Sequence, residues 1–178
     1  MKPIRLQTGR GRPEFIMLLV GLLLALGVLT LAFERILDQR QHPNQAVSAQ
    51  ALQDGSLEIR LDRNPQGHYL ASGHINGEPV RFLIDTGATG ISVPGHLARK
   101  LGLERGAAIP TRTAGGRVNS YLTQLESVSL GGIRQDDVRA TINPHMDLDE
   151  VLLGMSFLGP LEMEQRDGTL VIRQPARH

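Results

Sequence analysis

The feature that most constrains this chain is a run of 19 residues without a charge, from Phe15 to Phe33. Apart from Thr30 and two glycines the run is apolar. A helix of this length rises about 28 Å, which is close to the thickness of the hydrocarbon core of a bilayer. A domain as small as this chain allows cannot cover a helix that is apolar on every side. The sequence therefore predicts a transmembrane helix over residues 15–33.

The flanks of this run indicate its topology. The preceding segment has four cations and one acid: Lys2, Arg5, Arg10, Arg12 and Glu14. The following residues are balanced in charge: Glu34, Arg35, Asp38 and Arg40. The positive-inside rule then places the basic tail, residues 1–14, in the cytoplasm and the body of the chain in the periplasm or another extracytoplasmic space. We expect a single-pass protein of the inner membrane that contacts lipid through residues 15–33.

The alternative to a retained anchor is a cleaved signal peptide. The apolar core of a signal peptide is about 7 to 15 residues long, which is shorter than this run. Only Thr30-Leu31-Ala32 offers a small-residue cleavage site. We therefore expect the anchor to be retained.

The remainder of the chain divides by composition. Residues 34–55 are rich in Gln, Asp, Ala and Ser and predict a linker, with a helical continuation through Gln41. Residues 56–174 predict one folded domain, and residues 175–178 a short tail. From Glu34 onward 15 Lys and Arg face 17 Asp and Glu, and only 3% of the chain is aromatic. A near-neutral domain with few aromatic residues argues against nucleic acid as a partner.

Short β elements dominate the predicted domain. Asn76-Gly77 is a strong signal for a hairpin turn, because both central positions of a type I′ turn need a positive φ. One short helix is expected over Gly95–Leu103, where Gly102 ends it. A helical turn is expected at Met155–Leu158. The strands are expected at 57–61, 68–75, 80–84, 109–125 as a hairpin, 125–130, 138–142, 151–153, 161–163 and 170–172. The pattern predicts an all-β fold, a small closed barrel of about 115 residues.

One carboxylate stands out in this pattern. Asp85 follows the apolar strand Val80–Ile84 and precedes Thr86-Gly87-Ala88, and a second β-branched run begins at Ile91. A charge at the end of a buried strand requires pairing, hydrogen bonds or protonation. Catalysis is one reason for a protein to place an acid there.

These residues resemble the retropepsin-like aspartic proteases. The resemblance rests on Asp85-Thr86-Gly87-Ala88 after a strand, a glycine-rich hairpin about 30 residues later, and Leu152-Leu153-Gly154 near the C-terminus. The chain is similar, more narrowly, to a bacterial family of membrane-anchored members with a single lobe. The resemblance covers roughly residues 56–173. It implies an acid-protease barrel that hydrolyses peptide bonds in proteins or peptides, without a metal or other cofactor.

The resemblance also implies a role for individual residues. Asp85 is the catalytic acid, supported by the loop residues Thr86, Gly87 and Ala88. The flap that closes over a peptide contains Thr113, Ala114, Gly115 and Gly116, whereas an ordinary surface hairpin is the alternative for this segment. Gly154 is assigned a structural role, because a glycine there allows close packing of backbone beneath the active-site loop.

Hydrolysis by aspartic acids needs two carboxyl groups that share a proton. The chain contains only one loop of this kind, since Asp54-Gly55 and Asp167-Gly168 lack the motif and its apolar strand. We therefore expect a homodimer with the site on its two-fold axis. The alternative function is a non-catalytic module of the same fold that binds peptides or dimerises on a membrane stalk.

Other kinds of site have weak support in the sequence. The six histidines show no metal-ligand spacing, and the chain has no cysteine. Asp147, Asp149 and Glu150 could indicate calcium, but the glycine and the spaced fourth ligand of a calcium loop are missing. A solvated acidic loop is the favoured interpretation.

Overall fold

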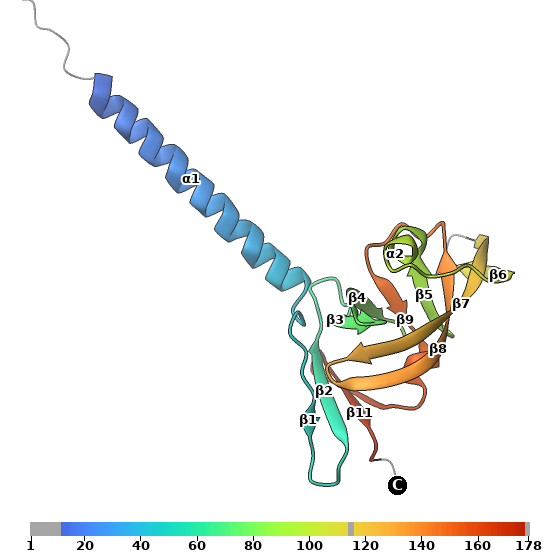
Figure 1. Cartoon of the computed structure of the whole chain (residues 1–178). Coiled ribbons are helices and arrows are strands. Elements are labelled where there is room, and N and C mark those ends of the chain that lie inside the picture. Colours follow the sequence, from blue (N-terminus) through green and yellow to red (C-terminus); the bar gives the residue numbers. More distant parts are fainter. Residues whose placement is uncertain (1–11, 114–115, 177–178) are drawn as a thin grey trace, which may run out of the picture. The chain divides into compact units, whose positions relative to one another are not determined.

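The computed structural model describes residues 12–113 and 116–176 (Figure 1). The chain forms two compact units, Met1–Gln39 and Arg40–His178. The first contains most of α1 (Arg12–Gln41), a helix of 30 residues. The large apolar side chains of α1, from Phe15 to Leu37, are all exposed. By length and composition α1 can cross a membrane, and a signal sequence would meet the same criteria.

The second unit contains a closed sheet. Its seven strands lie in the order β3 (Leu70–Ile75), β4 (Glu78–Ile84), β9 (Val151–Leu153), β5 (Ile91–Pro94), β8 (Ile133–Asn143), β7 (Gly116–Leu130) and β6 (Ala108–Thr113). Because β3 also pairs with β7, every strand except β6 belongs to a closed barrel. Figure 1 shows β7 and β8 as the two long, curved strands of this barrel. The predicted all-β fold with a small closed barrel is confirmed.

The core of the barrel follows from alternation along the strands. Successive side chains of a strand point to opposite faces of its sheet. Phe82 and Ile84 of β4 are buried, and so are Ile91 and Val93 of β5. The residues between them, Leu83 and Ser92, are only partly buried. One face of each strand therefore lines the core and the other forms the outer surface of the barrel.

A second, four-stranded sheet packs its apolar face onto the same core. Its order is β1 (Gln50–Ala51), β2 (Leu57–Asp62), β11 (Thr169–Gln174) and β10 (Glu162–Arg166). Its buried side chains are Ile59, Leu61, Leu170 and Ile172. Its other face carries charged side chains. One of them, Glu58, is only 6% exposed. The carboxylate of Glu58 binds Arg60 at 2.8 Å and Arg173 at 3.0 Å.

The predicted turns and helices are present. Asn76 and Gly77 both have a positive φ, 52° and 85°, as the type I′ prediction requires. Helix α2 (Gly95–Lys100) ends before Gly102, which has a φ of 66°. Helix α3 (Met155–Leu158) is a single turn.

Two features differ from the sequence-based expectation. The strand expected at 125–130 is not separate from the hairpin before it, because β7 runs unbroken from Gly116 to Leu130. The last part of the predicted linker over residues 34–55 is also not free chain, because β1 pairs with β2 there. Its first part is helical as far as Gln41, as the predicted continuation of the helix requires.

Asn44 explains why the predicted linker is folded. Its side-chain amide donates to the carbonyl oxygens of Asp62 at 2.9 Å and Leu70 at 2.7 Å, and its Oδ1 accepts from the N–H of Asp62. Its own carbonyl accepts from the N–H of Ser72. Asn44 therefore fixes the start of the second unit to β2 and β3, twelve positions before the predicted start at Ser56.

Candidate active site

The site is built where β4 ends. Strand β4 pairs in parallel with β9, with Ile84 opposite Leu153. The N–H of Asp85 donates to the carbonyl oxygen of Leu153 at 3.1 Å, so the contact with β9 continues for one residue beyond the strand. The backbone of Asp85 is consequently held by β9, although the residue itself lies in a loop.

The carboxylate of Asp85 is oriented by its own loop. The N–H of Gly87 donates to Oδ1 of Asp85 at 2.9 Å, and the N–H of Ala88 donates to the carbonyl oxygen of Asp85 at 3.2 Å. Asp85 is partly buried, whereas Thr86 and Gly87 are exposed. Within the described residues Oδ2 of Asp85 accepts no hydrogen bond from the protein. This oxygen is therefore available to a water molecule or to a second acid.

Gly154 lies directly beneath this loop. A Cβ atom at this position would stand 2.6 Å from the carbonyl oxygen of Ala88 and closer still to that of Gly90. Such distances are too short for any side chain, so only glycine fits. The next residue, Met155, donates its N–H to the carbonyl oxygen of Ala88 at 2.9 Å.

Ser156 holds the far end of the loop and was not singled out from the sequence. Its hydroxyl oxygen accepts a hydrogen bond from the N–H of Ile91 at 3.1 Å. Ile91 is the first residue of β5 and is completely buried. The sequence gave no indication of this contact, because the two residues are 65 positions apart and serine is common in helical turns.

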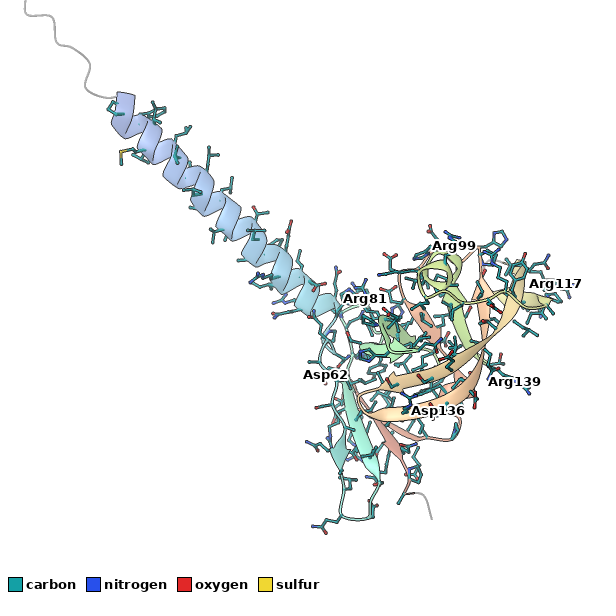
Figure 2. The ribbon with its side chains drawn as sticks, in the orientation of Figure 1. Asp62, Arg81, Arg99, Arg117, Asp136 and Arg139 are labelled. Atoms are coloured by element: carbon teal, nitrogen blue, oxygen red, sulfur yellow. The ribbon has the colours of Figure 1, made fainter. Side chains whose placement is uncertain are left out.

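The predicted flap is a hairpin of β6 and β7 that closes with Thr113 opposite Gly116. The other two predicted flap residues, Ala114 and Gly115, lie outside the described residues. Below the tip, Arg112 pairs with Arg117 on one face and both are exposed. Figure 2 shows Arg117 at the end of this hairpin.

A row of partly exposed side chains lies beside Asp85 on the outer face of the barrel. Alternation along β4 directs Leu83 to the same side as Asp85, two positions later. The strand registers then continue the row across four further strands, through Leu152, Ser92, Thr141 and Leu122. Most of its members are apolar, and Leu122 is the most exposed. The sequence alone did not identify this row.

Other acidic residues contact basic side chains. Asp149 lies 3.4 Å from His96, and Glu150 lies 3.8 Å from Arg81. Over residues 12–113 and 116–176, no three His, Asp or Glu side chains are grouped closely enough to hold a metal ion. In the same part of the chain no second carboxyl group is hydrogen-bonded to Asp85.

Comparison with known proteins places this geometry in context. The profile of the "gag-polyprotein putative aspartyl protease" family matches residues 71–160, which include Asp85 and Gly154. An uncharacterised protein in the cobV 5′ region of Sinorhizobium sp. is 34% identical over 115 residues, which are 63% of this chain and 49% of that protein. The uncharacterised protein RP867 of Rickettsia prowazekii is 31% identical over 121 residues, 65% of this chain and 50% of its own length. The chain thus spans about half the length of these curated relatives.

A solved structure also matches. The crystal structure of a retropepsin-like aspartic protease from Rickettsia conorii superposes with a TM-score of 0.56 at 27% identity. The match covers 74% of this chain and 96% of that one. The similarity therefore includes nearly the whole of the solved domain.

Proposed function

Because the chain belongs to the gag-polyprotein aspartyl protease family and has a retropepsin-like fold, we propose that it is an aspartic endopeptidase whose catalytic dyad forms from Asp85 of two protomers. One observation carries this proposal. Asp85 is held by β9 and by the N–H of Gly87, while its second carboxylate oxygen accepts no hydrogen bond from the described protein. A fixed acid with one open oxygen suits general acid–base catalysis.

The mechanism follows from two such carboxyl groups at close range. Like charges a few ångströms apart cannot both ionise readily, so the pair retains one proton and titrates as a unit. The ionised acid removes a proton from a water molecule, which attacks the carbonyl carbon of the peptide bond. The protonated acid donates a hydrogen bond to the carbonyl oxygen as negative charge develops there. Collapse of the tetrahedral intermediate expels the amine, which takes up a proton from the dyad.

A homodimer is required because the described part of one chain supplies a single acid at this site. Thr86 is exposed next to Asp85 and is placed to donate its hydroxyl to the equivalent loop of the second copy. Gly87 and Ala88 fix the carboxylate from within the same protomer. A two-fold axis through the two Asp85 loops satisfies these requirements.

The substrate is an extended peptide. The outer-face row from Leu83 to Leu122 offers three apolar side chains, Leu83, Leu152 and Leu122, for contact with the side chains of such a peptide. The hairpin of β6 and β7, whose described part closes with Thr113 opposite Gly116, would cover the bound peptide and exclude water. Gly154 supports the loop from below and takes no part in the chemistry.

The enzyme acts at a membrane in this proposal. Helix α1 is the retained anchor in the inner membrane, with the N-terminus in the cytoplasm and the protease domain in the periplasm. Its uniformly exposed apolar side chains support a lipid environment. Confining the protomers to a surface also raises their effective concentration and so favours the dimer.

The decisive experiment compares the full-length chain with Asp85→Asn in detergent, on a denatured protein substrate across a range of pH. We expect cleavage by the wild type and a loss of about 10³-fold or more in the variant, because the asparagine cannot exchange the proton. Asp136→Asn is the matched control, since Asp136 is an exposed acid paired with Arg134 on β8.

Equal cleavage by the wild type and Asp85→Asn would contradict the assignment of Asp85. Binding of the denatured substrate without cleavage at any pH would instead favour the non-catalytic peptide-binding module.

A further inference from the structure

A hollow of about 730 Å³ opens beside the last residues of α1. Arg40, which lies in the last turn of α1 and is the first residue of the second unit, lines this hollow. The rest of its wall comes from residues 62–67, at the end of β2 and in the loop that follows, and from the turn between β10 and β11. The wall therefore includes the residue of the folded unit that is nearest along the chain to the apolar run of α1.

Hydrogen bonds hold the walls of the hollow in place. The side-chain amide of Asn64, which is only 6% exposed, donates to the carbonyl oxygen of Gln41 at 3.3 Å. The N–H of Arg63 donates to the carbonyl oxygen of Gly168 at 2.9 Å. The loop after β2 is thus bound to the end of α1 on one side and to the turn before β11 on the other. These bonds fix the shape of the hollow in the absence of a ligand.

The charges that line the hollow are balanced. Two cations and two acids contribute to its wall: Arg40, Arg63, Asp62 and Asp167. All four are exposed. Asp62 accepts a hydrogen bond from the hydroxyl of Thr169 at 3.1 Å. Over the described residues the side chains of Arg40, Arg63 and Asp167 form no ion pair or hydrogen bond. Two cations and one acid are therefore available to a ligand that carries charges of both signs.

The length of α1 determines how far the hollow lies from a bilayer. Arg40 follows Phe33 by seven positions in one continuous helix, a rise of about 10 Å. The headgroup region adds about 5–8 Å to each side of the hydrocarbon core. The side chains of an α-helix point back toward its N-terminus, which for an anchored α1 is toward the bilayer. The guanidinium of Arg40 then reaches the depth of the lipid phosphates.

We propose that this hollow binds the headgroup of a zwitterionic phospholipid that carries a primary ammonium. Arg40 and Arg63 bind the phosphate, because guanidinium groups donate several N–H bonds to phosphate oxygens. Asp167 accepts hydrogen bonds from the ammonium, which has three donors. The proposal rests on the retained anchor of the proposed function. A headgroup held by both arginines fixes the folded domain on the surface of the bilayer.

The same charges discriminate between headgroups. An anionic headgroup without an ammonium satisfies the two arginines but places its negative charge beside Asp167 with nothing to offset it. A choline headgroup carries a positive charge but has no N–H to donate to Asp167. A lipid with a primary ammonium avoids both deficits and should be preferred.

The test is native mass spectrometry of the full-length chain in a neutral detergent, after addition of equal amounts of phosphatidylethanolamine, phosphatidylglycerol and phosphatidylcholine. We expect the wild type to retain phosphatidylethanolamine about fivefold over each of the other two, the ratio that an exposed ion pair can supply. Arg63→Gln should lower the retained phosphatidylethanolamine about fivefold. Asp167→Asn should reduce its preference over phosphatidylglycerol to within about twofold. Lipid that surrounds α1 binds all variants alike, so the differences report the hollow.

Both substitutions preserve the backbone around the hollow. Arg63 is bonded to Gly168 through its backbone N–H, which glutamine retains. Asp167 has a φ of 50°, a conformation that asparagine also adopts. The matched controls are Arg139→Gln and Asp137→Asn on β8, where both residues are exposed and Asp137 has a φ of 55°. Both controls should retain the three lipids as the wild type does.

Equal retention of the three lipids by the wild type would overturn the proposal, and so would an unchanged preference in Asp167→Asn. Soluble phosphoethanolamine, added alone at the same concentration, tests the source of the headgroup. If it is retained as well as the lipid is, the ligand is a soluble phosphate and the lipid assignment is wrong.

Failure of this proposal can be distinguished from failure of the proposed function. If the protein keeps α1 and cleaves its substrate but shows no lipid preference, only the headgroup site is wrong. If α1 is removed from the mature protein, the anchor and the headgroup site fall together, and the comparison with Asp85→Asn still decides the protease assignment.

Discussion

The two sheets of the folded unit are stabilised in different ways. Around Asp85 the contacts are mainly hydrogen bonds of backbone groups, and at Gly154 the carbonyl oxygens of Ala88 and Gly90 leave no room for a Cβ atom. On the outer face of the four-stranded sheet the contacts are ion pairs, with Glu58 between Arg60 and Arg173. The first region has no room for an added atom at Gly154, whereas the second depends on charge. A substitution that adds volume at the site should therefore cause a large loss of stability and activity. The stability that the charged sheet contributes should instead change gradually with pH and salt.

The largest effect that separates the two regions is expected for Gly154→Ala. The added methyl group would overlap the carbonyl oxygens of Ala88 and Gly90 and force the Asp85 loop to move. We expect a loss of about 2–4 kcal/mol in the free energy of unfolding and loss of most of the activity. Chemical denaturation and the cleavage assay measure the two effects.

Gly90→Ala is the matched control for this prediction. Gly90 belongs to the same loop, but a Cβ atom there would stand 3.6 Å from the hydroxyl oxygen of Ser156, an ordinary contact. It should change the free energy of unfolding by less than about 1 kcal/mol. Similar losses in the free energy of unfolding for Gly154→Ala and Gly90→Ala would contradict this explanation. They would show that any substitution near the loop is destabilising, whether or not the new side chain has room.

A smaller effect is expected for Ser156→Ala. The variant leaves the buried N–H of Ile91 without its acceptor, at a cost of about 1–2 kcal/mol in the free energy of unfolding. Because Ser156 acts on the Asp85 loop only through Ile91, we expect kcat to fall more than KM changes. Ser156→Thr retains the hydroxyl and should recover most of the activity. If Ser156→Ala lowers the free energy of unfolding but leaves kcat unchanged, Ser156 has only a structural role.

The smallest effect is expected on the charged sheet. The hydrogen bond from Arg173 lowers the pKa of Glu58 below its ordinary value of 4.5, and burial opposes this shift. A lowered pKa in the folded state stabilises the protein above the unfolded pKa, and the contribution is lost as the pH falls through the folded value. We expect Glu58→Gln to lower Tm by about 2–4 °C at pH 7, with less difference from the wild type below pH 4.5.

Thermal unfolding between pH 3 and pH 7 checks this prediction. Glu126→Gln, which changes an exposed glutamate on β7, serves as the control. A difference between Glu58→Gln and the wild type that stays constant over this range would show that charge is not the origin of the effect.

Features encoded in a few neighbouring residues could be predicted from the sequence. Asn76-Gly77 predicts its turn because the two residues themselves favour a positive φ. Phe15–Phe33 predicts a membrane-spanning helix because the run has no charge and is apolar apart from Thr30 and two glycines. Asp85 and Gly154 could be named because each stands in a short motif. These signals need no knowledge of which strands pair.

Contacts between distant residues could not be predicted. Asn44 binds Asp62 and Leu70, 18 and 26 positions away, and nothing in the composition of residues 34–55 distinguishes it from a residue of a flexible linker. Ser156 reaches Ile91 across 65 positions. The outer-face row beside Asp85 depends on four strand registers, and a shift of one residue in any of them would turn those side chains into the core.

The position of Asn44 also has a consequence for the proposed protease. Only His42 and Pro43 separate it from Gln41, the last residue of α1. A chain of two or three residues spans at most about 10 Å, and the helix extends only about 12 Å beyond Phe33. With α1 in a bilayer, the domain is confined to a layer roughly 40 Å deep next to the lipid headgroups. For a membrane-anchored protease of this kind, the distance of a cleavage site from the membrane would limit cleavage in addition to the sequence of the site. A site farther away than this layer would be out of reach.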